Sequence, residues 1–200
     1  MTVNIEIKVG GLLLAAGGST RFGSPKQLAE FEGKTLIRRA AEAVSRSGCS
    51  IVVVVLGAAA DGLRRELSNI DLDTVENKDW QSGMSSSIKL GLSKLIELEP
   101  QLDAVLITLM DQPKVTASHL AAFVSTFAEL RPPLIAAEYS GTTGVPALFS
   151  RVLFDELLQL KGDQGARSII RKRSDAQTIS LAEAAIDIDS LADLESLKRS

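Results

Sequence analysis

Short runs of aliphatic and β-branched residues alternate along the chain with segments whose apolar residues repeat at helical spacing. Runs such as 51–56 and 104–109 are almost entirely apolar, which is typical of strands buried on both faces of a sheet. The alternation predicts an α/β fold with a mostly parallel sheet and helices on both faces. The expected strands cover residues 11–15, 51–56, 74–76, 104–109, 134–137 and 147–149.

Three stretches between these strands carry apolar residues at i, i+3 and i+4 spacing, which predicts a helix with one buried face in each. These helices are expected around residues 36–47, 88–96 and 120–127. Arg131-Pro132-Pro133, after the last of them, is typical of a turn before the next strand. A chain of 200 residues can bury roughly 70% of its unfolded surface as one unit. No composition break or internal repeat divides it, so we expect one domain over residues 1–200.

Composition excludes several classes of function. The 22 basic residues are balanced by 25 acidic ones, and a net charge of −3 gives no general attraction for nucleic acid. With one cysteine, Cys49, and one histidine, His119, the chain has no intramolecular disulfide, no structural zinc site and no Ser/His/Asp or Cys/His catalytic device that does not use His119. The longest aliphatic run, 51–56, is far shorter than the ~20 residues that cross a bilayer. The N-terminus lacks signal-peptide character, so we expect no membrane partner and a cytoplasmic protein.

Glycine, hydroxyl and charged residues follow the first expected strand, at the edge where ligands bind in open parallel sheets. Gly17, Gly18 and Gly23 allow the backbone to approach a ligand closely, and Arg21 and Lys26 add two cations. Amide donors together with Arg and Lys suit a triphosphate. The segment matches neither a P-loop nor the GxGxxG pattern, and an ordinary strand-to-helix turn is the alternative interpretation.

Acidic residues provide candidate metal ligands. Asp111 ends an apolar run, so its carboxylate is expected at the same edge of the sheet, where it suits Mg²⁺ held jointly by protein and substrate phosphates. A cap or turn role for Asp111 is the alternative. Asp187 and Asp189 alternate along an extended segment and are expected to face one side, although Asp189-Ser190 also suits a cap of the last helix.

A middle segment carries Asn77, Trp80, Gly83 and Ser87 just before or within the start of a helix, whose amide N-terminus suits an anion or a base edge. Trp80 as a core residue is the alternative for that position. A basic cluster further on contains Lys161, Arg167, Arg171, Lys172 and Arg173, which suits either a solvated face or an anionic acceptor.

Several of these segments carry a resemblance to a known family. The stretch LAAGGSTRFGSPKQL, residues 14–28, resembles the signature loop of the MobA-like nucleotidyltransferases, in particular the branch of molybdenum cofactor cytidylyltransferase. The pieces N-x-x-W-x-x-G-x-x-x-S-I, DQP, G-x-P-x-L-F and DIDS follow in the family's order, so the resemblance covers essentially the whole chain. Val145 stands where the family usually has His, which leaves the acceptor open.

The resemblance implies a Rossmann-like three-layer fold of the nucleoside-diphospho-sugar-transferase type and a Mg²⁺-dependent nucleotidyltransferase. Such an enzyme moves a nucleoside monophosphate from an NTP, with CTP favoured, to a phosphorylated acceptor such as molybdopterin and releases pyrophosphate. A molybdoenzyme or its chaperone is an implied partner. The alternatives are transfer to a sugar phosphate or methylerythritol phosphate, and a non-catalytic nucleotide-binding or cofactor-delivery protein.

The resemblance also assigns roles to individual residues. It implies that Arg21, Lys26 and Asp111 are catalytic and that Asp111 and Asp189 bind the metal. The nucleotide-binding residues that it implies are Leu14, Ala15, Ala16, Gly17, Gly18, Arg21, Lys26, Gly83 and Ser87.

Overall fold

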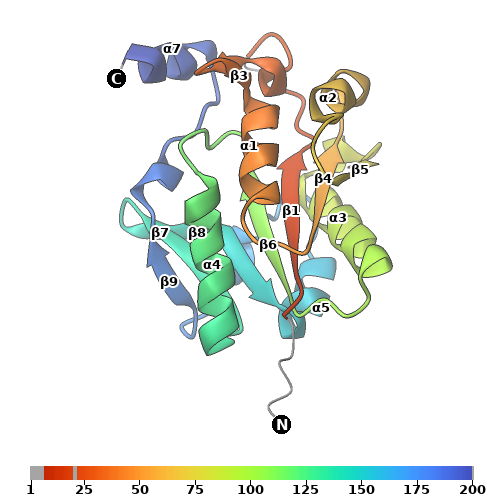
Figure 1. The fold of residues 1–200 in the computed structure, drawn as a ribbon, viewed down its shortest axis with the longest axis vertical. Helices are drawn as coiled ribbons and strands as arrows, with labels where there is room; N and C mark the ends of the chain where they lie inside the picture. The colour runs from red at the N-terminus through yellow and green to blue at the C-terminus, as the bar shows by residue number, and fades with distance from the viewer. Residues whose placement is uncertain (1–6, 20–21, 200) are drawn as a thin grey trace.

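Seven strands form one sheet in the computed structural model, which describes residues 7–19 and 22–199 (Figure 1). The strand order is β5-β4-β1-β6-β8-β7-β9. The strands are β1 (Val9–Ala15), β4 (Ile51–Leu56), β5 (Asp73–Glu76), β6 (Ala104–Leu109), β7 (Leu134–Tyr139), β8 (Thr142–Ser150) and β9 (Gln177–Ser180). A separate short hairpin consists of β2 (Glu30–Phe31) and β3 (Lys34–Thr35).

β1 lies at the centre of the parallel part of the sheet. It pairs in parallel with β4 on one side and with β6 on the other, so that Leu14 lies opposite both Val55 and Leu109. Of the seven strands, β8 alone is antiparallel to both of its neighbours, β6 and β7. This register brings the carboxyl ends of β1, β4 and β6 to one edge of the sheet, as expected from the sequence.

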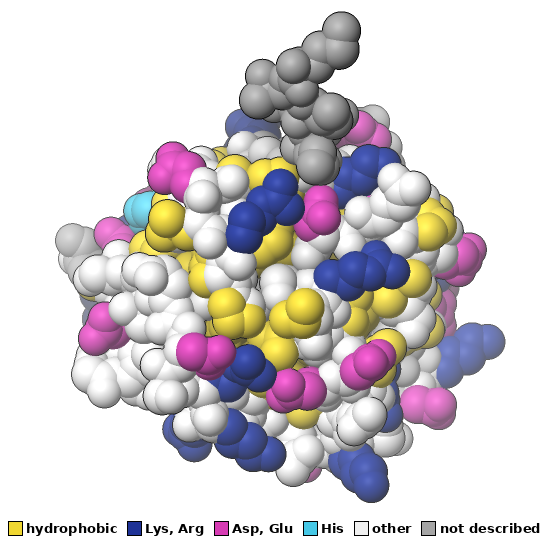
Figure 2. Space-filling view, turned by 90° about the horizontal axis from the view of Figure 1, so that it is seen from below, with side chains coloured by type: hydrophobic (Ala, Val, Ile, Leu, Met, Phe, Trp, Pro, Cys, Tyr) yellow, Lys and Arg dark blue, Asp and Glu magenta, His cyan; other side chains and the backbone are white. Residues whose placement is uncertain are grey.

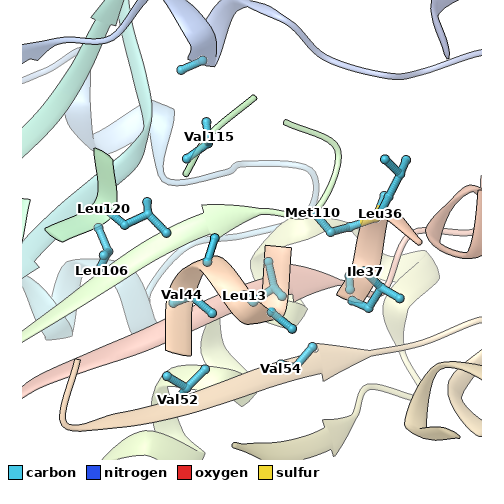
Figure 3. Packing of buried hydrophobic residues seen from close by; sticks show 14 of the residues in the cluster. Leu13, Leu36, Ile37, Val44, Val52, Val54, Leu106, Met110, Val115 and Leu120 are labelled. Carbon is cyan, nitrogen blue, oxygen red and sulfur yellow. The ribbon is translucent and has the colours of Figure 1, made fainter. Parts of the chain in front are cut away.

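Helices cover both faces and make a three-layer α/β fold. Alternate residues of β1 point to opposite sides, so Leu13 belongs to one apolar cluster and Leu12 to the other. Figure 3 shows Leu13, Val52 and Val54 of the sheet near Ile37 and Val44 of α1. One face carries α1 (Leu36–Ser45), α2 (Ala60–Leu67), α4 (Ala117–Leu130) and α7 (Leu191–Arg199), and the other carries α3 (Met84–Leu98), α5 (Phe154–Leu158) and α6 (Arg167–Ile170).

Four short 3₁₀ turns complete the secondary structure of the described residues. They are η1 (Lys26–Leu28), η2 (Trp80–Ser82), η3 (Arg151–Leu153) and η4 (Ala182–Ala185). η1 and η2 follow the carboxyl ends of β1 and β5, and they bring two of the sequence-predicted segments to the same end of the molecule.

All six expected strands are present, and two features of the sheet were not predicted. β7 and β8 are longer than expected and form a hairpin through Ser140 and Gly141, whose φ values of 48° and 71° match the left-handed turn that joins antiparallel strands. β9 is also new, because its four residues are mostly exposed and leave no apolar run in the sequence. The expected turn after α4 is present, with Arg131 left-handed at φ 51°.

Figure 2 shows the lower end of the molecule in the view of Figure 1. On this surface Lys and Arg are interspersed with Asp and Glu among hydrophobic side chains.

His119 lies at the start of α4, where its side chain and that of Thr116 cap the helix, so this histidine has a structural role. None of the helices in the described ranges is long and apolar enough to cross a membrane.

Two helical glycines give a matched test of the packing between α3 and β1. A Cβ on Gly91 of α3 would lie 2.3 Å from Leu12 Cδ1, whereas a Cβ on Gly62 of α2 would meet nothing closer than 3.7 Å. Gly91→Ala should therefore lower the free energy of unfolding by about 1–3 kcal/mol, because the Cβ would also lie 2.7 Å from Val55 Cγ2 and both side chains are fully buried, so the packed core must shift. Gly62→Ala should raise it by about 0.5–1 kcal/mol through helix propensity. Urea unfolding of both variants checks this, and equal effects would contradict it.

Candidate functional site

A cavity of about 590 Å³ opens at the carboxyl edge of the sheet. Its lining comes from the loop after β1, from the segment that starts α3, and from the end of β6. All of the predicted nucleotide-binding residues that the structure describes line it, namely Leu14, Ala15, Ala16, Gly17, Gly18, Lys26, Gly83 and Ser87, and so does Asp111. Arg21 lies outside the described residues.

Gln27 fixes the loop after β1. It is almost fully buried, and its Nε2 donates to the carbonyl oxygens of Ala15 at 3.1 Å and Gly17 at 2.7 Å. Its Oε1 accepts from the Ser19 hydroxyl at 3.0 Å. Because a trans peptide points its C=O and N–H in opposite directions, the N–H of Gly18 is directed away from Gln27. Gln27 was not among the predicted site residues, although it directly follows Lys26 in the motif of residues 14–28.

Lys26 joins the loop to two other segments. Its Nζ donates to Asp111 Oδ2 at 2.8 Å, to Asp189 Oδ1 at 3.1 Å and to the carbonyl oxygen of Ile188 at 3.0 Å. Burial opposes the charge on the ammonium, but the attraction of Asp111 and Asp189 outweighs it and raises the pKa of Lys26. The structure therefore brings together three of the predicted site residues around one charged amine.

Asp111 carries an unsatisfied oxygen. Oδ2 binds Lys26, but Oδ1 is buried and has no hydrogen-bond partner among the described residues. A buried carboxylate oxygen without a partner is costly, and a hard divalent cation would satisfy it. The side chains at this point therefore fit the predicted metal. No group of three or more His, Cys, Asp or Glu within the described ranges is arranged to hold a metal ion, so part of its coordination would come from substrate oxygens and water.

In the C-terminal segment, Ser190 and the Asp189 carboxylate make different contacts. Ser190 caps α7: its hydroxyl accepts from the Asp193 N–H at 3.3 Å, and Asp193 Oδ2 accepts from the Ser190 N–H at 2.7 Å. The Ser190 hydroxyl donates to the Asp193 carboxylate at 2.8 Å, and this bond, together with those from the backbone N–H groups of Ser190 and Asp189, lowers the pKa of Asp193. The Asp189 carboxylate is thus not the cap, and it binds Lys26 instead. The Ile188 N–H donates to the Asp111 carbonyl at 2.9 Å and holds the segment against β6.

Asp187 also faces this region, as the alternation along the segment predicts. It lines a second cavity of about 290 Å³ that shares lining residues with the first. Desolvation raises the pKa of the Asp187 carboxyl, and the neighbouring charge of Asp111 raises it further. Negative charge is therefore concentrated around Lys26.

The segment before α3 is held by Asn77. This buried side chain donates to the hydroxyl oxygens of Ser86 at 2.8 Å and Ser87 at 2.9 Å. Gly83 begins α3 with φ 108°, and a Cβ there would lie 2.4 Å from the backbone of Gly162, so only glycine fits. Trp80 packs on the apolar cluster of α3 and also lines the large cavity, so the core and site interpretations both apply to it.

The second cavity is mostly apolar and lies on the β8 side of the site. Arg167 lines it and donates to the Tyr139 hydroxyl at 2.7 Å. Val145, which departs from the family pattern, lines it as well. Arg173, another member of the predicted basic cluster, forms ion pairs with Glu156 and Asp175.

Comparison with known proteins identifies the family. A family model described as the MobA-like NTP transferase domain matches residues 11–178. The chain belongs to this family. Its fold is also that of 4-diphosphocytidyl-2C-methyl-D-erythritol synthase from Anaerococcus prevotii, with a TM-score of 0.75 at 13% identity over 96% of this chain and 95% of that one. As a member of the MobA-like family the chain is a nucleotidyltransferase-superfamily enzyme, and the structural similarity shows the predicted three-layer fold.

Three relatives are similar over most of their length. Nicotine blue oxidoreductase from Paenarthrobacter nicotinovorans is 31% identical over 82% of each chain, and the purine catabolism protein PucB from Bacillus subtilis is 27% identical over 80% of each. Rv0371c from Mycobacterium tuberculosis gives a TM-score of 0.85 at 25% identity, covering 97% of this chain and 98% of that one, and its complex with manganese has been solved as well. These names differ from molybdenum cofactor cytidylyltransferase, so the closer resemblance to that branch stays a prediction.

The role of Gln27 can be tested through stability. Gln27→Leu removes the donor that binds Ala15 and Gly17, leaving buried carbonyl oxygens unpaired, and should lower the free energy of unfolding by about 1–3 kcal/mol. The control Gln81→Leu, at an exposed position of the same cavity, should change it by less than about 0.5 kcal/mol. Chemical denaturation of both variants provides the measurement, and an unaffected Gln27→Leu protein would show that the loop is held by other contacts.

Proposed function

We propose that this protein is a divalent-metal-dependent nucleotidyltransferase that moves a nucleoside monophosphate from an NTP to a phosphorylated small molecule. The observation that carries the proposal is the cluster of Lys26, Asp111 and Asp189 at one end of a cavity lined by the glycine loop. A cation for the phosphates and carboxylates for a metal are both needed where a triphosphate reacts. The family membership supports the same reaction class.

CTP and molybdopterin are the donor and acceptor that we propose first. The motifs of residues 14–28 and the later DQP and DIDS segments support this choice through their similarity to the cytidylyltransferase branch. The mostly apolar cavity lined by Val145 and Arg167 supports an acceptor with a flat, partly apolar body. The same cavity is compatible in size with other phosphorylated acceptors, including a sugar phosphate or methylerythritol phosphate.

The reaction needs no general base from the protein. A phosphate oxygen of the acceptor, already anionic at neutral pH, attacks the α-phosphorus of the NTP in line. One P–O bond forms, the bond between the α-phosphorus and the bridging oxygen breaks, and pyrophosphate leaves. In this scheme the Lys26 ammonium and the loop amides, including that of Gly18, neutralise phosphate charge and orient the triphosphate.

Asp111 and Asp189 are the residues that would hold a divalent metal. When bound, Mg²⁺ or Mn²⁺ supplies positive charge to the phosphates at the reacting end of the nucleotide. The buried, unpaired Oδ1 of Asp111 supports this role, and so does the manganese complex of Rv0371c. In this proposal, the segment that starts α3 contacts the base and ribose through Gly83 and Ser87, which line the cavity.

Pyrophosphate release with CTP, GTP, ATP or UTP and molybdopterin tests the reaction. We expect release with one nucleotide, its loss in EDTA and its recovery with Mg²⁺ or Mn²⁺. Lys26→Ala and Asp111→Asn should each lower kcat/KM about 100-fold or more, because each removes charge that stabilises the transition state. Lys94→Ala, on the exposed side of α3 and paired with Glu97, should leave the rate unchanged. Full activity of Lys26→Ala would refute the role of the loop, and no release with any pair would refute the molybdopterin version.

A non-catalytic nucleotide-binding protein is separated from an enzyme by a binding measurement. Trp80 is the only tryptophan and lines the cavity, so its fluorescence should change when the favoured NTP binds with Mg²⁺. An enzyme should show this change together with pyrophosphate release, whereas a binding protein should show the change alone. Trp80→Phe removes the signal and serves as the control. A fluorescence change that is indifferent to Mg²⁺ would contradict the proposed metal.

The similarity to nicotine blue oxidoreductase favours one competing function, an oxidoreductase. The Lys26–Asp111 pair favours phosphoryl chemistry over it, because that pair offers charge for phosphates. Incubation with NADH or NADPH and a redox dye, followed by absorbance, separates the two functions. The oxidoreductase would be favoured if the protein oxidised NADH or NADPH, if the Asp111→Asn variant did so equally well, and if no pyrophosphate were released.

A further inference from the structure

The amine of Lys26 occupies the position from which a metal would bind Asp111 and Asp189. Nζ lies 2.8 Å from Asp111 Oδ2 and 3.1 Å from Asp189 Oδ1, and the Ile188 carbonyl at 3.0 Å takes a third hydrogen bond. The Lys26 side chain is 13% exposed and that of Asp111 is 21% exposed, so this pair is largely shielded from water. A cation that binds both carboxylates must share them with the ammonium or displace it.

We propose that Lys26 and a divalent cation compete for the carboxylates of Asp111 and Asp189, so that the position of Lys26 sets the affinity for the metal. The ammonium and the metal ion are both positive, and at a separation of a few ångströms in a shielded site their repulsion is strong. While Lys26 lies against Asp111, metal binding is weak. When Lys26 moves away, the same carboxylates are available to the metal.

Phosphate groups provide the means of moving Lys26. The lysine, Asp111 and the glycine loop line one cavity, so a triphosphate bound along the loop lies within reach of the flexible lysine side chain. Transfer of the ammonium from carboxylate to phosphate removes the competitor while the phosphates add oxygen ligands. Metal and nucleotide should then bind together, with each increasing the affinity of the other.

This second step rests on the proposed function, since it assumes a nucleotide in the cavity. The competition itself does not, because it concerns only the protein and the metal. The two ideas therefore fail separately: pyrophosphate release tests the reaction, and metal binding in the absence of nucleotide tests the competition.

Mn²⁺ binding measured by electron paramagnetic resonance tests the competition on the full-length protein without nucleotide. Lys26→Met keeps the length of the side chain and removes its charge, and it should bind Mn²⁺ at least about tenfold more tightly than the unaltered protein. Lys26→Arg keeps a competing cation and should bind Mn²⁺ as weakly as the unaltered protein. Equal or weaker binding by Lys26→Met would overturn the proposal.

Two further variants locate the effect. Adding Asp111→Asn to Lys26→Met should abolish the gained Mn²⁺ affinity, because it removes a carboxylate for which the metal competes. Lys94→Met removes a lysine that pairs with Glu97 and should leave Mn²⁺ affinity unchanged. A gain that persists without the Asp111 carboxylate, or that Lys94→Met reproduces, would show a general charge effect and overturn the proposal. Thermal unfolding of each variant confirms that the comparison is between folded proteins.

Discussion

The ion pair between Lys26 and Asp111 connects parts of the chain that are 85 residues apart, and Asp189, 163 residues from Lys26, joins the same amine. It can form only because β1 and β6 are parallel neighbours, with Leu14 opposite Leu109, so that the residues following both strands meet at one edge. The hydrogen bond from Ile188 to the Asp111 carbonyl then brings in the C-terminal segment. The candidate site thus depends on the register of two central strands.

The sequence predicts those parts of the fold and site that follow from strong local patterns. Buried apolar runs locate the strands, and Lys26 and Asp111 can be placed at one edge because each follows such a run. β9, which pairs with β7, cannot be found this way, because its residues are mostly exposed and contain no apolar run. The Ser140-Gly141 turn was a usable signal for the longer hairpin.

The side-chain contacts within the site are harder to predict because they depend on groups brought together by the fold. Gln27 is polar in the sequence, and only the structure shows it buried against the carbonyls of Ala15 and Gly17. By binding these carbonyl oxygens, Gln27 fixes the orientation of the peptide groups in the loop. For Asp189-Ser190, only the structure shows that Ser190 caps α7 while the Asp189 carboxylate contacts Lys26.

The two cavities share part of their lining, including Leu14 and Met84, but differ in the rest. The loop after β1 and the start of α3 line the larger one, whereas Tyr139, Val145 and Arg167, from β7, β8 and α6, line the β8 side of the smaller. The antiparallel hairpin packs at the margin of the parallel core, and its side chains can change without altering the pairing of β1 with β4 and β6. Substitutions of Tyr139, Val145 or Arg167 can therefore reshape the smaller cavity while the loop after β1 keeps its geometry.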